Sequence, residues 1–231
     1  MCALQFNKTG AADTDKVALQ DVIQLKGIQA YDIDNSEKRA FIYFQQENGT
    51  YEPFYFINDA LDADDEEVIG DVWADGDDYV CTDINKKDIG KAFWFNAPVC
   101  EAGASITIAG QVKEAVSDPM PFPAVTFRML ANPYPMAIAL NSGKFNISGV
   151  DAYDIDNSEK RAFVYVMKAN GTYEPFYYIN DALDGEDEEV VGDVWADGDD
   201  YYVEPTTTQI PAGQSFWVYS PVTAGSITIT K

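Results

Sequence analysis

The chain has 231 residues, of which 46% are apolar, and a formal charge of −24 from 39 acidic and 15 basic side chains. The length suits one large or two modest domains, and the apolar fraction is too high for a disordered acidic tail. The negative field repels phosphate backbones and lipid head groups, and no window approaches a membrane-spanning apolar run, which argues against nucleic-acid partners and direct membrane insertion.

The elements expected along the first half are mostly short strands. The N-terminal sequence MCALQFNKTG lacks the basic and apolar regions of a signal peptide, so either the protein stays inside the cell or Met1 is not the natural start. Only residues 17–25 suit a short helix. Asn48-Gly49 separates two runs rich in β-branched and aromatic residues, which predicts a hairpin with a type I′ turn. Glu52-Pro53 in the second run favours an edge position.

An acidic stretch follows, with ten carboxylates and no Lys or Arg between Asp59 and Asp78, and residues 181–200 match it. Carboxylates at this density repel one another unless they extend into solvent or share a cation, so we hold three hypotheses: a Ca²⁺ site, a solvated loop with diffuse ion attraction, or a regulatory or partner contact. Two Asp-x-Asp segments in each half have the spacing of calcium loops, although none fits the EF-hand pattern. The candidate metal ligands are Asp32, Asp34, Asp75, Asp77, Asp154, Asp156, Asp197 and Asp199.

Three cysteines, Cys2, Cys81 and Cys100, all lie in the first half. An odd number cannot pair fully within one monomer. A bridge between Cys81 and Cys100 is sterically plausible because they flank the strand with Phe93 and Trp94, and free thiols are the alternative.

Between the halves, Pro119, Pro121 and Pro123 alternate with other residues, which favours an extended, semi-rigid connector. We therefore expect a first domain over residues 1–110, a Pro-rich linker over 111–123 and a second domain over 124–231. In the second domain, residues 215–219 and 226–230 read as a further pair of strands.

The two halves are copies of one unit. Long blocks recur at one constant offset: AYDIDNSEKRAF begins at Ala30 and Ala152, NGTYEPFY at Asn48 and Asn170, and GDVWADGDDY at Gly70 and Gly192. So long a period implies complete domains and not a short-repeat solenoid. The second copy opens with a strand over residues 125–131, whereas Met1-Cys2-Ala3 aligns with Met129-Leu130-Ala131, so half of that strand is missing. This suggests a processed piece of a longer precursor or head-to-tail assembly, in which another segment satisfies the strand edge.

The aromatic residues allow two interpretations. Tyr51 and its neighbours, together with Trp73 or with Trp195 in the second copy, could form a sugar-stacking platform. The alternative is the core, which we expect for Phe54, Phe93, Trp94, Phe216 and Trp217.

Catalytic machinery is not recognisable. The chain has no histidine, which removes the commonest general base, the usual zinc ligand and Ser-His-Asp or Cys-His centres. Asp-rich loops can supply a glycosidase carboxylate pair, but two nearly identical sites in one small chain would be unusual for an enzyme.

Asn132-Pro133-Tyr134-Pro135 after an opening strand, with residues 210–218 (IPAGQSFWV) near the end, resembles a repeat module of secreted or surface β-rich proteins of Bacteroidetes and Verrucomicrobia type. The resemblance covers the second copy, whereas the first copy lacks both signatures. It implies a secreted or surface-exposed β-module, without an activity.

The sequence therefore predicts an all-β protein of two tandem homologous domains, each a sandwich or barrel-like unit. The expected function is a non-enzymatic extracellular structural or surface protein, part of a larger assembly or filament, which self-associates and whose acidic loops face solvent or Ca²⁺. The alternative is a carbohydrate-binding or adhesin module with a glycan partner.

Overall fold

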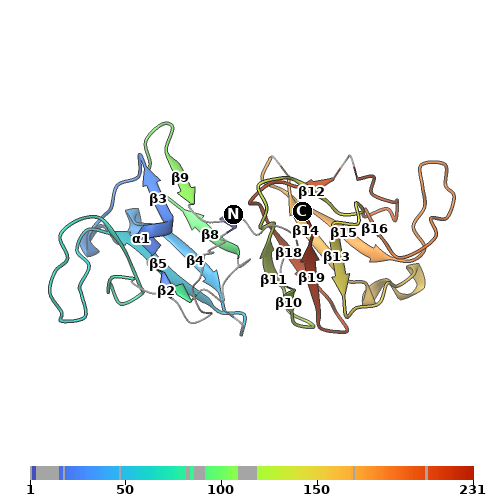
Figure 1. The fold of residues 1–231 in the computed structure, drawn as a ribbon, viewed down its shortest axis with the longest axis horizontal. Coiled ribbons are helices and arrows are strands. Elements are labelled where there is room, and N and C mark those ends of the chain that lie inside the picture. Colours follow the sequence, from blue (N-terminus) through green and yellow to red (C-terminus); the bar gives the residue numbers. More distant parts are fainter. Residues whose placement is uncertain are drawn as a thin grey trace. The chain divides into compact units, whose positions relative to one another are not determined.

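The computed structural model describes residues 2–3, 16–17, 19–46, 48–81, 84–85, 92–108, 119–168, 170–205 and 208–231. The chain divides into two compact units, Met1–Gln111 and Val112–Lys231 (Figure 1). The fold is all-β, with 42% strand against 8% helix, and none of the sheets in the described part closes into a barrel. None of the helices described is long and apolar enough to cross a membrane.

The first unit contains short strands and two short helices. Its elements are β1 (Cys2–Ala3), β2 (Lys16–Val17), α1 (Leu19–Val22), β3 (Ile23–Lys26), the 3₁₀ helix η1 (Ile33–Lys38), β4 (Ala40–Gln45), β5 (Tyr51–Ile57), β6 (Val72–Ala74), β7 (Ile84–Asn85), β8 (Ala92–Asn96) and β9 (Ser105–Ile108). The helix expected over residues 17–25 is confirmed only as the single turn α1. Beyond it, Ile23 and Leu25 alternate with polar residues, which is the period of a strand.

The second unit repeats the order of the strands and the 3₁₀ helix, adds the strand β10 at its start, and has no counterpart of α1 among its described residues. Its elements are β10 (Met120–Phe122), β11 (Arg128–Ala131), β12 (Ile138–Ala139), β13 (Phe145–Ser148), η3 (Ile155–Lys160), β14 (Phe163–Met167), β15 (Tyr173–Ile179), β16 (Val194–Ala196), β17 (Gln209–Ile210), β18 (Ser215–Tyr219) and β19 (Gly225–Ile229).

Each unit is built on an antiparallel five-stranded sheet. The strand order is β1-β8-β4-β5-β6 in the first unit and β11-β18-β14-β15-β16 in the second. The predicted hairpin between β4 and β5 is confirmed. In its turn the Gly49 amide donates to the Gln46 carbonyl, and Gly49 takes a positive φ of 84°, which glycine adopts readily.

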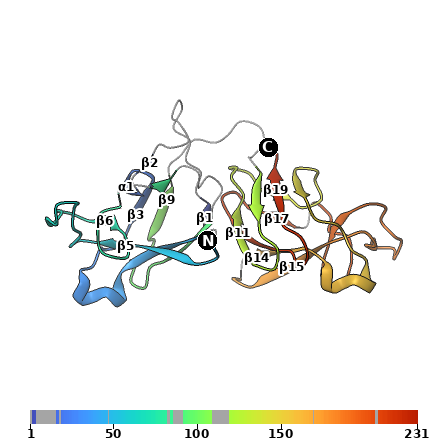
Figure 2. The ribbon, with the colours of Figure 1, turned by 90° about the horizontal axis from the view of Figure 1, so that it is seen from below.

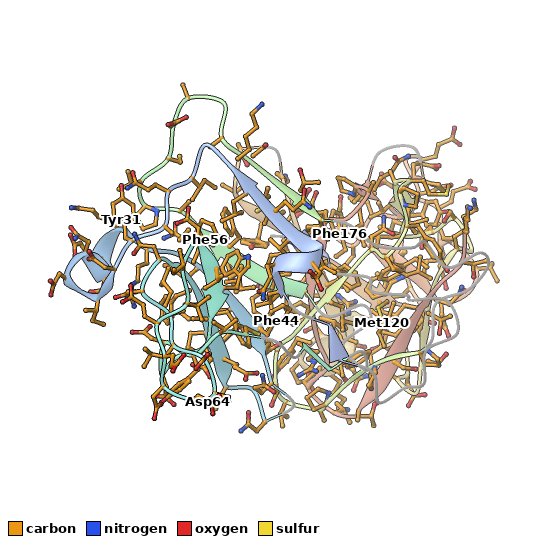
Figure 3. All side chains as sticks on the ribbon, turned by 60° about the vertical axis from the view of Figure 1, so that its left-hand side comes forward. Tyr31, Phe44, Phe56, Asp64, Met120 and Phe176 are labelled. Atoms are coloured by element: carbon orange, nitrogen blue, oxygen red, sulfur yellow. The ribbon has the colours of Figure 1, made fainter. Side chains whose placement is uncertain are left out.

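A second, smaller sheet covers one face of each five-stranded sheet. It has the order β10-β19-β13 in the second unit, and its counterpart in the first unit is the pair β3-β9. The main core cluster of the second unit contains Val164 and Phe216 from the large sheet together with Phe145 and Ile227 from the small one. The corresponding cluster of the first unit joins Ile42 and Phe44 of β4 to Ile23 of β3; Figure 3 shows Phe44 inside the unit and Asp64 at its surface. Each unit is therefore sandwich-like.

Two sequence-based assignments are corrected by these sheets. Residues 215–219 and 226–230 are not a strand pair, because β18 pairs with β11 and β14 while β19 pairs with β10 and β13. The short connection between them crosses from one sheet to the other.

Part of the expected linker also belongs to the second unit. Met120 and Phe122 of β10 are 6% and 2% exposed, and the strand pairs with β19 through Met120–Ile227 and Phe122–Gly225. Pro121 fits there because β10 is an edge strand, where one side needs no backbone N–H. Alternating prolines favoured an extended chain in either case, so their pattern could not distinguish a connector from an edge strand.

The alignment of the two opening strands is confirmed by their registers. Cys2 of β1 lies opposite Phe93, and Leu130 of β11 lies opposite the matching Phe216. Cys81 is buried and Cys100 is exposed, and both are free thiols, so the plausible bridge between them is not formed.

Candidate functional site

The acidic loops, residues 59–78 and 181–200, are anchored to the large sheets (Figure 1). In the first unit Ile57, Ala60 and Ala74 form a small buried cluster with Tyr55 and Val80 around it. Ile179, Ala182 and Ala196 form the same cluster in the second unit. Each loop therefore has its own apolar attachment, and its acidic residues project from that base.

One buried arginine in each unit fastens the acidic loop to the turn before β4 or β14. Arg39 is 4% exposed; its Nη1 donates to Asp78 at 3.0 Å and its Nη2 to Asp59 at 3.2 Å, while Nε donates to the carbonyls of Tyr31 and Asp32. Arg161 repeats every one of these contacts with Asp200, Asp181, Tyr153 and Asp154. Figure 2 shows the two turns around η1 (blue) and η3 (yellow-orange), which precede β4 and β14 in the chain.

Several other aspartates close turns of their own backbone. Asp75 Oδ1 accepts hydrogen bonds from the amides of Asp77 and Tyr79, both at 3.0 Å, and Asp62 Oδ1 accepts from Asp64 and Glu66. The second loop repeats both arrangements through Asp197 and Asp184. These are Asx-type turns, which explains how so dense a row of carboxylates holds a defined shape.

The eight predicted calcium ligands divide into two kinds. Asp32, Asp75, Asp154 and Asp197 each accept backbone hydrogen bonds at a turn or helix cap, and Asp34, Asp77, Asp156 and Asp199 are exposed. Across the described residues, no three His, Cys, Asp or Glu side chains come together in a group that could hold a metal ion. The structure thus places these residues in two separate turns of each unit, with a capping role for half of them.

A tyrosine at the end of each loop bonds to an aspartate within it. The Tyr79 hydroxyl donates to Asp65, and the Tyr201 hydroxyl donates to Asp187 at 2.6 Å. The hydrogen bond to Asp65 and the negative charge of that carboxylate raise the pKa of Tyr79 above its ordinary value of 10.0. The same two causes, from Asp187, raise the pKa of Tyr201.

The tryptophans proposed for sugar stacking are in the core. Trp73 is 0% exposed and Trp195 is 2% exposed, so neither ring can lie against a ligand, and that assignment is corrected. The other two tryptophans were expected in the core and do not lie there: Trp94 is 37% exposed, and Trp217 is only half-buried. Phe54, Phe93 and Phe216 are in the core as expected. Adjacent strand residues face opposite sides of a sheet, and Phe93 takes the inner side.

The face of each large sheet away from the core carries aromatic rings. We call it the outer aromatic face. In the second unit it consists of Phe127, Phe163, Tyr165, Tyr173, Tyr177, Trp217 and Tyr219. Phe127 lies over four of the other rings, with centroid distances of 4.7 Å to Tyr219, 5.8 Å to Phe163, 6.0 Å to Tyr165 and 6.4 Å to Trp217.

The first unit has the same face with fewer rings, namely Phe41, Tyr43, Tyr51, Tyr55 and Trp94. Phe41 and Tyr43 are 4.8 Å apart, and Trp94 lies opposite Tyr43 in the strand register. Asn96 occupies the position opposite Phe41 that Tyr219 has opposite Phe163. Tyr51 is 42% exposed and is hydrogen bonded to the Trp94 side chain.

The residues behind the family resemblance form one structural contact. Asn132 is 0% exposed, and its Nδ2 donates to the carbonyls of Met136, Ile210 and Pro211 at 2.7 to 3.1 Å, while its Oδ1 accepts from the Tyr134 amide. The two signature segments, far apart in sequence, are therefore two turns held together by one buried side chain.

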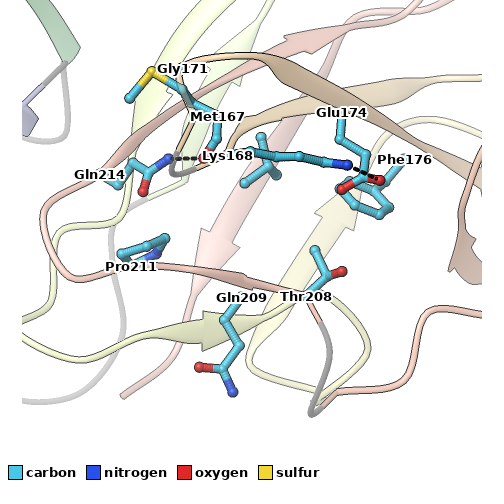
Figure 4. A pocket seen from close by; sticks show the side chains of 10 residues that line it. Met167, Lys168, Gly171, Glu174, Phe176, Thr208, Gln209, Pro211 and Gln214 are labelled. Atoms are coloured by element: carbon cyan, nitrogen blue, oxygen red, sulfur yellow. Dashed lines mark hydrogen bonds and ion pairs between the residues drawn. The ribbon is translucent and has the colours of Figure 1, made fainter.

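A shallow cleft of about 570 Å³ lies beside these turns in the second unit (Figure 4). On the hairpin side of the cleft Lys168 pairs with Glu174 at 2.6 Å, and across the cleft Gln214 Nε2 donates to the Met167 carbonyl at 2.7 Å. Sequence reasoning did not find this cleft, because its lining comes from the β14–β15 hairpin and from residues 208–214, which no short motif joins.

Comparison of the chain with family models, with curated proteins and with solved structures gave no match.

Proposed function

We propose that this protein is a non-enzymatic extracellular structural protein whose repeated units bind partners, including further copies of the module, through their outer aromatic faces. The observation that carries the proposal is the recurrence of that face at equivalent positions: Phe41, Tyr43 and Trp94 in one unit, and Phe163, Tyr165 and Trp217 in the other. Contiguous exposed aromatic side chains are typical of protein interfaces, where aromatic residues are enriched.

Exposed apolar residues in the acidic loops and the 3₁₀ turns of both units add to this argument. Ile69 and Val191, at equivalent positions in the acidic loops, are 99% and 96% exposed, and Ile33 and Ile155 are 59% and 62% exposed. Single exposed apolar residues are ordinary. Their recurrence in both units, on loops whose shape is fixed by Arg39 and Arg161, supports a role in contact with a partner.

Carbohydrate binding is the second candidate, since Tyr51 and Trp94 are adjacent and are 42% and 37% exposed. The ring geometry favours it less. Phe41, Tyr43 and Tyr55 are tilted by 44° to 60° from one another at centroid distances of 4.8 to 6.2 Å, which is the arrangement of packed aromatic side chains. A flat sugar ring stacks best on an exposed ring that lies parallel to it.

Sedimentation velocity over a range of concentrations tests the proposal. We expect the full chain to form larger species as its concentration rises, and the Tyr43→Ser/Tyr165→Ser double variant to remain the smallest species. Ile69→Ser/Val191→Ser tests the loop tips separately. An unchanged sedimentation coefficient at all concentrations, together with saturable binding to neutral glycans that the same double variant loses, would instead support the carbohydrate function.

A further inference from the structure

A small cavity of about 270 Å³ lies at one side of the second unit, where an end strand of each sheet contributes to it. In the described part of the unit, β13 is an end strand of the small sheet and β16 an end strand of the large one. The cavity is smaller than the roughly 300 Å³ at which pockets for drug-sized ligands begin, so it suits a single small group. Its lining includes Phe145, Asn146, Tyr178, Asp193, Trp195 and Tyr202.

The two end strands are joined by Asn141, which precedes β13. Its Nδ2 donates to the carbonyls of Trp195 and Val203, both at 2.8 Å, and its Oδ1 accepts from the Trp195 amide at 2.9 Å. The Trp195 ring is 2% exposed and packs against Tyr178 and Phe145, with centroid distances of 5.3 Å and 5.6 Å. The cavity is therefore preformed, and Trp195 supports its walls without being open to a ligand.

Comparison of the two copies singles out this cavity. Across residues 30–81 and their gapless match in the second copy, an apolar residue is replaced by a hydroxyl-bearing one at two positions: Phe56 by Tyr178, and Val80 by Tyr202. Both tyrosines line the cavity. A region that is apolar in the first unit has thus gained hydrogen-bonding groups in the second.

The charge around the cavity selects the kind of ligand. Asp193 is the charged residue of the lining, and it belongs to the acidic loop 181–200, which has ten acidic and no basic side chains. Burial raises the pKa of Tyr178, and the charge of Asp193 and a hydrogen bond to it raise this pKa further, so the phenol is neutral beside the carboxylate. A carboxylate with aromatic rings next to it repels anions and attracts organic cations.

We propose that this cavity binds an alkylammonium group, either the end of a lysine side chain or a free amine. The ammonium donates to Asp193, and the rings of Tyr178 and Tyr202 lie beside it. The methylene stem of the ligand lies against the apolar part of the lining, which includes Ile147 and Val194. The site is separate from the outer aromatic faces, so the inference goes beyond the proposed function and does not rest on it.

The test is a titration of the full chain with n-butylammonium chloride at constant ionic strength, followed by the chemical shifts of the backbone amides. We expect saturable binding that the neutral analogue 1-butanol does not reproduce. Asp193→Asn should weaken it at least about tenfold, because hydrogen bonds to a charged partner contribute that much. The matched control is Asp71→Asn at the equivalent position of the first unit, which should change the affinity less than about twofold.

The double variant Tyr178→Phe/Tyr202→Val gives a second measurement that does not alter charge. It places in the second unit the residues that the first unit has at these positions, so the unit should still fold. Loss of one ring and one hydroxyl should weaken binding about three- to thirtyfold. Absence of saturable binding, equal losses with Asp71→Asn and Asp193→Asn, equal binding of 1-butanol, or full affinity of the double variant would overturn the inference.

A blocked lysine, Nα-acetyl-lysine N-methylamide, distinguishes the two sources of the ammonium group. Tighter binding than that of n-butylammonium would support a lysine of a partner polypeptide, and equal or weaker binding would support a free amine. Self-association measured by sedimentation is independent of both ligands, so its failure would count against the proposed function and leave this site standing.

Discussion

Arg39 and Arg161 connect the most charged loops of the molecule to its sheets. Each guanidinium lies in a buried site and bonds to two aspartates and two backbone carbonyls. Removing one partner of such a network leaves buried groups without hydrogen bonds, which costs more than the network's net contribution.

We therefore expect Arg39→Ala and Arg161→Ala each to lower the free energy of unfolding of its unit by about 2 to 4 kcal/mol. Arg39→Lys should recover little, because one ammonium cannot reach both aspartates and both carbonyls as the guanidinium fork does. Urea unfolding followed by circular dichroism measures these changes. Lys38→Ala is the control: Lys38 lies on the surface, and its loss should cost less than about 0.5 kcal/mol. Equal effects of Lys38→Ala and Arg39→Ala would refute a structural role for the network.

The loop tyrosines give a prediction at high pH. The pKa of Tyr79 and of Tyr201 is raised in the folded protein, chiefly by the hydrogen bond to Asp65 or Asp187 and by the charge of that carboxylate. The stabilisation from these bonds is complete below the ordinary tyrosine pKa of 10.0 and is lost as the pH rises through the higher folded value. In an absorbance titration of tyrosinate, Asp65→Asn and Asp187→Asn should each shift one tyrosine to a lower pH. An unchanged titration curve would show that these bonds do not form in solution.

At the level of the elements, the alternation of apolar and polar residues predicted where the strands lie better than it predicted which side of each strand faces the core. Asn-Gly between two aromatic runs was sufficient to find the β4–β5 and β14–β15 hairpins, because few other structures satisfy both signals. The same reasoning failed for Trp94, since Ala92-Phe93-Trp94-Phe95 is apolar on both faces and gives no sign of which side is the core. Trp73 failed for a different reason: its strand β6 has three residues inside an acidic loop, too few for a period to show.

The sequence showed the acidic composition of these loops but did not predict their structure. Their density of aspartates indicated turns, but the particular partners, such as Asp59 with Arg39 and with the Ile33 amide, join residues 20 or more positions apart. No local sequence pattern marks such pairs, so the sequence did not predict them.

Asn132 joins two turns of the second unit by hydrogen bonds. Its substitution tests whether the residues behind the family resemblance have a structural role. Asn132→Ala would leave the buried carbonyl of Ile210 and the partly buried carbonyl of Pro211 without their donor, so we expect a loss of about 2 kcal/mol in the free energy of unfolding. Asn132→Asp should be at least as damaging, because a carboxylate would face three carbonyl oxygens. Asn141→Ala is a useful comparison, since Asn141 also bonds to two carbonyls through Nδ2 but is less buried. Wild-type stability of Asn132→Ala would show that this contact contributes nothing.

For the whole molecule, the net charge of −24 decides the response to cations. Because half of the predicted calcium ligands already cap backbone turns, and because the described carboxylates form no group of three, we expect diffuse attraction. Ca²⁺ and Mg²⁺ at equal concentration should then raise the Tm by equal amounts, through screening of like charges. A rise with Ca²⁺ at micromolar to millimolar concentration that Mg²⁺ does not reproduce would instead establish a specific site.

The two units should also differ in stability, because their small sheets differ. In the second unit β19 lies between β10 and β13, and Ile227 and Ile229 are 0% exposed. In the described part of the first unit β9 pairs with β3 alone, and the matching Ile106 and Ile108 are only partly buried. Each unit has its own core cluster, so calorimetry should show two unfolding transitions, of which the lower belongs to the first unit.

A matched pair of variants assigns the transitions. Ile106→Ala should lower the Tm of the first transition only, and Ile227→Ala that of the second only. The second change should be the larger, because a fully buried isoleucine costs about 2 to 5 kcal/mol when it is cut back to alanine and a half-exposed one costs less. If both variants shift a single transition by the same amount, the two units unfold as one cooperative structure, and the first unit gains from some other contact what its small sheet lacks.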